Sequence, residues 1–172
     1  LEMILQKCNF PQLKRLDLSQ NDGINDEVLK ILLKQDWPLL ETLNLNFTEI
    51  TFKGELNFIL DANWPNLKDI SLKWLSNGLA TSLLPKNQPL LETLNLRNCS
   101  ITQTELEMIL QKCNFPQLKH LDLSQNEKID DEVLKILLKQ DWPLLETLNL
   151  YFTNTTFKGE LDFILDANWP NL

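Results

Sequence analysis

The sequence LKHLDLSQN at residues 118–126 sets three leucines in the pattern L-x-x-L-x-L and ends on an asparagine three residues after the third leucine. The last two leucines alternate with a polar residue, which is the period of a β-strand with one buried and one exposed side. Closely similar stretches occur at 13–21, 40–48, 67–75, 91–99 and 145–153. The chain is therefore expected to contain the same short strand six times.

Each strand belongs to a longer repeat that begins at a proline. Seven of the eight prolines recur every 27 residues, or 24 in one case, and an aromatic residue precedes each of these seven except Pro89, which follows Gln88. We divide residues 1–172 into a partial unit 1–10, units 11–37, 38–64, 65–88, 89–115, 116–142 and 143–169, and a partial unit 170–172. A 105-residue super-repeat relates 1–67 to 106–172, with differences at only eight of 67 positions. We expect one repeat array that is a fragment of a longer one.

A helix is expected after most strands. Good N-cap residues precede the helical stretches, and Thr102 with Glu105 has the spacing of a capping box. These N-caps are Asn25, Thr51, Thr102, Asp130 and Thr156. Apolar residues at helical spacing follow, such as Leu106, Ile109 and Leu110. The aromatic residue before each proline is expected to fill the core. Unit 65–88 should instead carry a short or 3₁₀ turn, because Gly78 and Pro85 interrupt its helical stretch.

The turn after each strand should be held by a side chain that bonds to backbone amides, because a buried irregular turn leaves such groups unpaired. The residues at this place are Asn21, Thr48, Leu75, Cys99, Asn126 and Thr153. All but Leu75 can make such a bond.

The six copies, among them LKRLDLSQN, LETLNLRNC and LKHLDLSQN, resemble the leucine-rich-repeat family, and 27-residue units with a helix resemble its ribonuclease-inhibitor-like subclass. The resemblance implies an α/β solenoid, a right-handed arc with a parallel β-sheet on the concave face and helices on the convex face. It also implies protein binding through the concave sheet. Independently of it, stacking of such units would bury one continuous core and align equivalent residues into rows.

The outward residues of the expected strands form four rows. Row one is Arg15, Thr42, Asp69, Thr93, His120 and Thr147. Row two is Asp17, Asn44, Ser71, Asn95, Asp122 and Asn149. Row three is Ser19, Asn46, Lys73, Arg97, Ser124 and Tyr151. Row four is Gln20, Phe47, Trp74, Asn98, Gln125 and Phe152. Charges alternate just before the strands, which should favour correct stacking, at Lys14, Glu41, Lys68, Glu92, Lys119 and Glu146.

We expect these rows and the loops at their rim to bind a partner protein. The candidate residues are Arg15, Asp17, Asn44, Asn46, Phe47, Asp69, Lys73, Trp74, Asn95, Arg97, His120, Asp122, Asn149, Tyr151 and Phe152. Trp74 should pair with Phe47, and Tyr151 with Phe152; the alternative is that row four lies partly buried under the following loop.

The differences between the two long copies give a second argument for this face. Seven of the eight lie in outward strand positions or the loop after them, and only Asn57/Asp162 lies on the helix side. We interpret this as diversification of a binding face, with drift as the alternative.

Composition and motifs exclude several classes of function. The net charge of −8 argues against nucleic acid, and no apolar run is long enough to cross a membrane. Three cysteines are too few for a disulfide framework and favour a reducing, cytoplasmic location. No spacing suits a metal, a cofactor or a catalytic centre, and the lone histidine, His120, is replaced by Arg15 in the other copy. We therefore predict a non-enzymatic protein.

Two functions from different classes remain. The first is a protein-binding module of the adaptor, receptor, effector or inhibitor type. The alternative is a structural repeat array without a dedicated partner, which would associate head to tail through uncapped ends.

Overall fold

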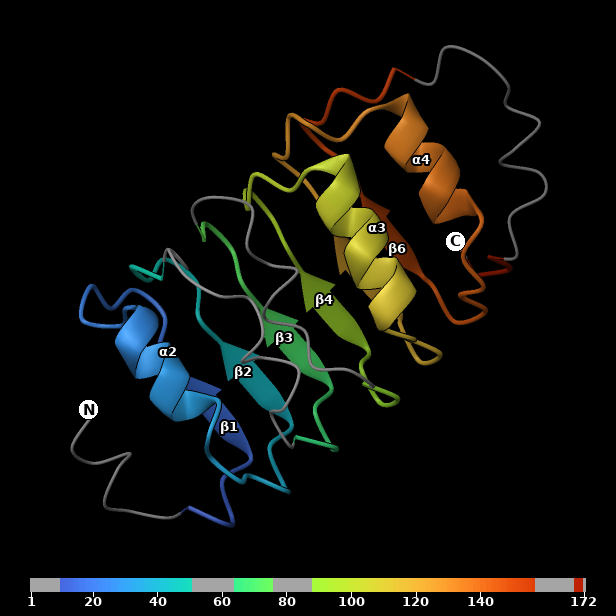
Figure 1. Ribbon diagram of the computed structural model, residues 1–172. Coiled ribbons are helices and arrows are strands. Elements are labelled where there is room, and N and C mark those ends of the chain that lie inside the picture. Colours follow the sequence, from blue (N-terminus) through green and yellow to red (C-terminus); the bar gives the residue numbers. More distant parts are fainter. Residues whose placement is uncertain (1–9, 51–63, 76–87, 157–168, 172) are drawn as a thin grey trace.

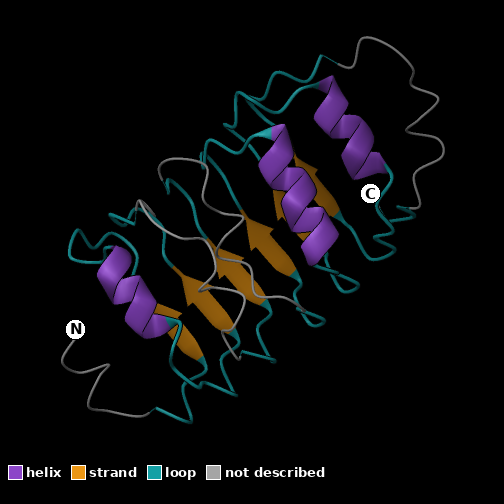
Figure 2. Cartoon of the chain, viewed as in Figure 1, coloured by secondary structure: helices purple, strands orange, loops and turns teal. Residues whose placement is uncertain are grey.

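The computed structural model describes residues 10–50, 64–75, 88–156 and 169–171. Within these ranges, six strands form one parallel sheet in chain order (Figure 1): β1 (Arg15–Asp17), β2 (Thr42–Asn44), β3 (Asp69–Ser71), β4 (Thr93–Asn95), β5 (His120–Asp122) and β6 (Thr147–Asn149). The helices described there, α2 (Asp26–Leu32), α3 (Gln103–Lys112) and α4 (Asp131–Leu138), lie on one side of the sheet (Figure 2). The predicted α/β solenoid is confirmed.

Neighbouring strands pair in register, so equivalent residues of successive units lie side by side. Leu43 in β2 is paired with Ile70 in β3, and Leu121 in β5 with Leu148 in β6. Leu43, Ile70 and Leu121 are buried, whereas their neighbours in each strand belong to rows one and two. This register confirms both rows as they were read from the sequence. The side of the sheet that bears rows one and two, with rows three and four beyond them, carries no described helix and is called the open face.

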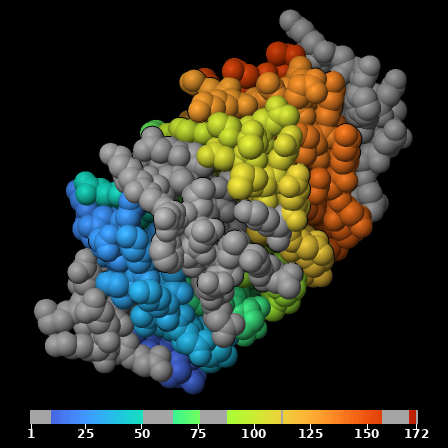
Figure 3. All heavy atoms as spheres, viewed as in Figure 1, coloured from blue at the N-terminus to red at the C-terminus, as the bar shows by residue number. Residues whose placement is uncertain are grey.

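The described helices begin where the sequence predicts. The Asn25 side chain accepts hydrogen bonds from the N–H groups of Glu27 and Val28, and Asp130 caps α4 in the same way. Thr102 and Glu105 form the predicted capping box at α3. The apolar stripe of each helix joins the strand leucines in the core. Figure 3 shows the helix side, where α3 and α4 lie against each other.

The aromatic residues before the prolines fill the core, as predicted. Trp37 stacks on Trp64 with ring centroids 6.0 Å apart, and Trp142 stacks on Trp169 at 5.9 Å. Phe10 is the exception, because it remains 37% exposed at the start of the described chain. The core is therefore one continuous column along the solenoid.

The turn after the strand is held by side-chain hydrogen bonds, but not always of the predicted kind. Buried Asn126 bonds backbone amides, and the Cys99 thiol donates to the carbonyl of Leu72 at 2.8 Å. Cys99 thus differs from the prediction, and so do Thr48 and Thr153, whose hydroxyls donate to carbonyls three residues earlier, just after their strands. A short hydroxyl three residues past a carbonyl reaches that acceptor before any amide of the next turn.

The charges that alternate before the strands form ion pairs between neighbouring units. Lys14 and Lys68 both approach Glu41, at 3.9 and 3.4 Å, and Lys119 lies 2.7 Å from Glu92. The hydrogen bond from Lys119 lowers the pKa of the Glu92 carboxyl. These exposed pairs support correct stacking, as expected, and each contributes modestly because water screens it.

Several sequence-based expectations lie outside the described residues. These are the N-cap Thr51 with its helix, the shortened turn around Gly78 and Pro85, the helix after Thr156, Cys8, and the Asn57/Asp162 difference. The unit boundaries and the longer array remain predictions. None of the described helices is long and apolar enough to span a membrane.

Candidate functional site

The side chains of row two face outward, and most of them also terminate their strands. Five of its six residues use Oδ1 to accept a hydrogen bond from the N–H two residues later, at 2.9–3.2 Å: Asp17, Asn44, Asn95, Asp122 and Asn149. This is an Asx-type turn, which closes the strand locally. The Ser19 hydroxyl and N–H both bond Asp17 and lower the pKa of its carboxyl. In these five candidate residues, Oδ1 is therefore already engaged in a hydrogen bond within the chain.

Strand β3 is terminated in another way, because its row-two residue is Ser71. Here Asn46 of the previous unit reaches across and accepts from the Ser71 hydroxyl at 2.9 Å and from the Lys73 N–H at 2.7 Å. Asn46, predicted as a partner-binding residue, therefore ties two units together. Its counterpart in the second copy, Tyr151, is exposed.

Row four adopts a left-handed backbone throughout. All six residues have φ between 52° and 64°: Gln20, Phe47, Trp74, Asn98, Gln125 and Phe152. This conformation costs bulky residues about 1–2 kcal/mol each. It is held because the N–H groups of the first five donate to row-three carbonyls of the next strand at 2.8–3.0 Å. Regular strand alternation would turn row four toward the core, and the left-handed residue redirects it to the open face.

The aromatic side chains of rows three and four are consequently exposed and paired. Phe47 stacks on Trp74 with centroids 5.5 Å apart, and Tyr151 meets Phe152 edge-on at 4.5 Å. Their exposed fractions are 45% for Phe47, 46% for Trp74, 65% for Tyr151 and 66% for Phe152. The predicted pairs are confirmed, and all four side chains are exposed, although Phe47 and Trp74 are more covered than Tyr151 and Phe152.

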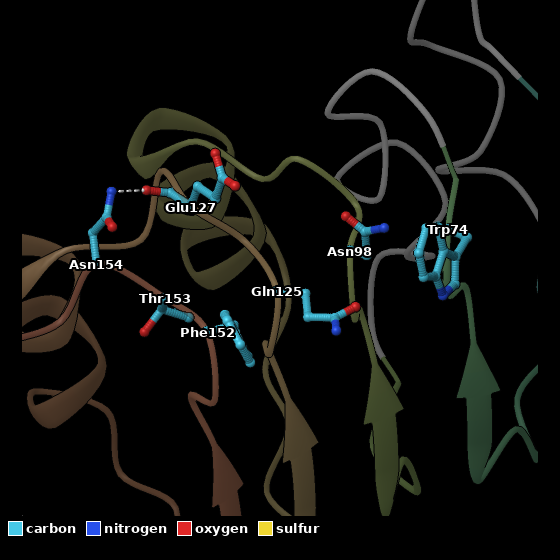
Figure 4. A pocket seen from close by; sticks show the side chains of 7 residues that line it. All are labelled: Trp74, Asn98, Gln125, Glu127, Phe152, Thr153 and Asn154. Carbon is cyan, nitrogen blue, oxygen red and sulfur yellow. Dashed lines mark hydrogen bonds between the residues drawn. The ribbon is translucent and has the colours of Figure 1, made fainter.

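A groove of about 420 Å³ runs along row four on the open face (Figure 4). It is lined by Trp74, Asn98, Gln125, Glu127, Phe152, Thr153 and Asn154. The structure thus brings Trp74 and Phe152 to one site, together with residues that the sequence-based set omitted. Asn98 and Gln125 were visible as members of row four, and Glu127 and Asn154 as positions that differ between the copies. The Asn154 side chain donates to the Glu127 carbonyl and joins the two rim loops.

Two cations of row three lie beside this groove. Lys73 follows β3 and Arg97 follows the adjacent β4, and the Arg97 Nε donates to the Gln125 side chain at 3.2 Å. Neither forms an ion pair with a carboxylate in the part of the chain that the structure describes. They are the two cations of row three, on a chain whose net charge is −8.

The remaining charged candidates lie in rows one and two, and none of them lines the groove. Arg15 pairs with Asp17 at 3.6 Å, and the His120 Nδ1 lies 2.8 Å from the Thr147 hydroxyl. Asp69 occupies the row-one position of β3. The groove therefore collects only part of the predicted set, and row one forms a separate polar strip.

The structure corrects one argument about the two long copies. Ile50, which differs from Thr155, is buried in the core, and the Asn25/Asp130 pair caps helices. Two of the seven differences thus concern internal packing or capping. The other five lie in rows one and three or in exposed loops, so the diversification hypothesis now rests on fewer positions.

The described chain offers little reactive chemistry. Burial raises the pKa of the Cys99 thiol to about 12, which makes a thiolate nucleophile inaccessible near neutral pH. Among the described residues, no three histidine, cysteine, aspartate or glutamate side chains cluster as metal ligands would.

Comparison with known proteins identifies one family. The family model described as Leucine Rich repeat matches residues 11–29 and again 116–134. The two matched segments are equivalent parts of the 105-residue super-repeat. No curated protein matches the sequence.

Proposed function

Since this chain is a leucine-rich-repeat protein, we propose that it binds a partner protein through the open face of its sheet and the loops at the rim. Domains of this family generally mediate protein–protein interaction and are typically non-enzymatic. The proposal adds the surface that this chain would use, which is rows one to four with the rim around Glu127 and Asn154.

The observation that carries the proposal is the exposure of four aromatic side chains on a rigid sheet. Trp74, Phe47, Tyr151 and Phe152 are each between 45% and 66% exposed. Exposed aromatic clusters of this kind mark interaction surfaces, and tryptophan and tyrosine are enriched among the residues that dominate binding energy. The surrounding polar rows supply hydrogen-bonding groups for a rim.

The backbone under these side chains is pre-organised. The N–H groups of Phe47 and Trp74 are bonded to the next unit, and row-two side chains close five of the six strand ends. A partner would therefore lose little free energy to ordering this surface, which raises affinity for a given contact area. Binding without backbone rearrangement is expected.

Affinity capture from a lysate of the source organism, read by mass spectrometry, tests the proposal. Wild type is compared with a variant carrying Trp74→Ala, Tyr151→Ala and Arg97→Glu. A matched control carries Gln111→Ala, Lys34→Ala and Lys139→Glu, which repeat two truncations and one charge reversal at exposed positions of the helix side. Circular dichroism must first show that all three fold alike.

A partner kept by wild type and the control but lost by the open-face variant supports the proposal. Equal capture by all three chains would place the binding site elsewhere and refute the choice of surface. If wild type retains no specific partner, the structural repeat array becomes the better reading.

A further inference from the structure

We infer that the groove along row four binds an extended acidic peptide segment with apolar side chains at positions i and i+4. This inference rests on the proposed function and specifies the chemistry of the partner. Four features of the groove carry it: its direction, its aromatic ends, its amide floor and the cations beside it.

The groove crosses the strands instead of following them. Its floor residues Trp74, Asn98, Gln125 and Phe152 occupy the same row in four successive units. Adjacent strands are about 4.8 Å apart, so Trp74 and Phe152 are separated by three spacings, or about 14 Å. An extended chain advances about 3.3 Å per residue. About four residues therefore bridge the two aromatic ends, and side chains at i and i+4 would reach both.

The ends of the groove favour apolar side chains. Trp74 is backed by its stack with Phe47, and Phe152 by its edge contact with Tyr151. Each aromatic ring is thus held in place from one side while its other surface stays open. An apolar side chain placed on such a ring removes apolar surface from water on both partners, at about 25 cal/mol per Å².

The middle of the groove favours a peptide backbone. Asn98 makes no side-chain hydrogen bond to any residue the structure describes, and Gln125 accepts from Arg97 through Oε1, which leaves its Nε2 as a donor. Figure 4 shows both amides between the two aromatic residues. A peptide carries one N–H and one C=O per residue that must stay paired when it is covered. The Asn98 amide and the Gln125 Nε2 can pair with these backbone groups. A purely apolar ligand has no such groups and would leave both unpaired.

The charges beside the groove select an acidic segment. Lys73 and Arg97 lie on adjacent strands next to the Trp74 end, and the row-two residues of those strands, Ser71 and Asn95, are neutral. A carboxylate between the two cations would relieve their mutual repulsion and accept charge-assisted hydrogen bonds. Glu127 lines the rim nearer Phe152. We therefore place the acidic residue of the segment close to the side chain that contacts Trp74.

Selection of random phage-displayed dodecapeptides on the immobilised full chain tests the inference. The expected consensus contains aspartate or glutamate beside one of two apolar residues spaced i, i+4. A synthetic fluorescein-labelled peptide with that consensus then gives dissociation constants by fluorescence polarisation. Lys73→Gln, Arg97→Gln and Trp74→Ala are each expected to weaken binding about tenfold. Lys34→Gln removes the same charge from an exposed position on the helix side, outside the open face, and should leave binding unchanged.

The possible outcomes separate this inference from the proposed function. Basic or uncharged consensus sequences, no enrichment at all, or binding that ignores the Lys73, Arg97 and Trp74 variants would each overturn the peptide inference. The proposed function would survive any of these results if the open-face triple variant still lost its captured partner, because a folded surface could bind there instead. Retention of the partner by that variant would refute the proposed function itself.

Discussion

Asn126 is a buried side chain that joins two units at a turn, and its replacement by alanine tests how the solenoid is held together. Its Oδ1 accepts from the N–H groups of Cys99 and Ile101, at 3.0 and 3.1 Å. Its Nδ2 donates to the carbonyls of Leu96 and Leu123, at 2.9 and 2.8 Å. Three of these four partners belong to the preceding unit, so the side chain joins two units in the core.

The expected cost follows from the groups left behind. Asn126→Ala leaves the N–H groups of Cys99 and Ile101 without their acceptor at a fully buried site. Each buried donor without a partner costs about 1–3 kcal/mol, which gives about 2–6 kcal/mol in total. Single domains have total stabilities of about 5–15 kcal/mol. The variant should therefore be strongly destabilised, and a water molecule that enters the space would bring the cost toward the lower end.

Asn21 provides a matched control, because it occupies the same place in the repeat 105 residues earlier. It is exposed, and its side chain accepts a hydrogen bond from the Gly23 N–H at 3.1 Å. Asn21→Ala should cost about 0.5–1.5 kcal/mol, the usual net value of one hydrogen bond. The same chemical change is thus expected to have very different effects at two equivalent positions.

Urea unfolding of the wild type and both variants, followed by far-ultraviolet circular dichroism and by tryptophan fluorescence, measures the difference. Agreement of the two signals is needed because units of a repeat protein can unfold separately. A loss below about 1 kcal/mol for Asn126→Ala, or equal losses for the two variants, would refute the argument that these buried bonds between units hold the turn.

Three further outcomes follow from the structure. Trp142→Ala, which removes a buried ring stacked on Trp169, should cost about 3–5 kcal/mol in the same urea assay, and a loss under about 1 kcal/mol would contradict the packing. Because Lys119 lowers the pKa of Glu92, ionised Glu92 should stabilise the fold above its ordinary pKa of about 4.3 and lose that contribution as the pH falls through the lower folded-state value. The stability gap between wild type and Glu92→Gln should accordingly narrow on acidification, whereas a gap independent of pH would argue against the pair. The Cys99 thiol, with a pKa of about 12, should resist iodoacetamide in the folded chain and react at the rate of unfolding, so rapid alkylation seen by peptide mass spectrometry would show that it is not buried.

Much of the fold could be predicted because its determinants are local. The alternation around Leu121, the capping box of Thr102 and Glu105, and the N-cap Asp130 each involve residues a few positions apart. Such patterns are visible in one copy and are strengthened by repetition. The regular spacing of units then places equivalent residues opposite one another, which is why rows one and two were read correctly before the register was known.

The candidate site was predicted less completely, because its shape depends on contacts between units. The open-face rows and both aromatic pairs were expected, but Asn98, Gln125 and Glu127 were not among the candidate residues. Ile50 appeared to be a surface difference, although its side chain is buried. Position in a loop does not tell whether a side chain points out or in.

The sequence alone determined the strand, the cap and the period of this protein, since these depend on residues within one unit. The tertiary structure decided how the strand ends: the left-handed backbone of Trp74 is held by the Arg97 carbonyl of the next unit. It also decided that side chains from four units meet in one groove. Backbone bonds between residues about one repeat apart have no signature in any single unit. The repeat can thus be recognised from the residues of single units, whereas the groove on the open face forms only when the units stack.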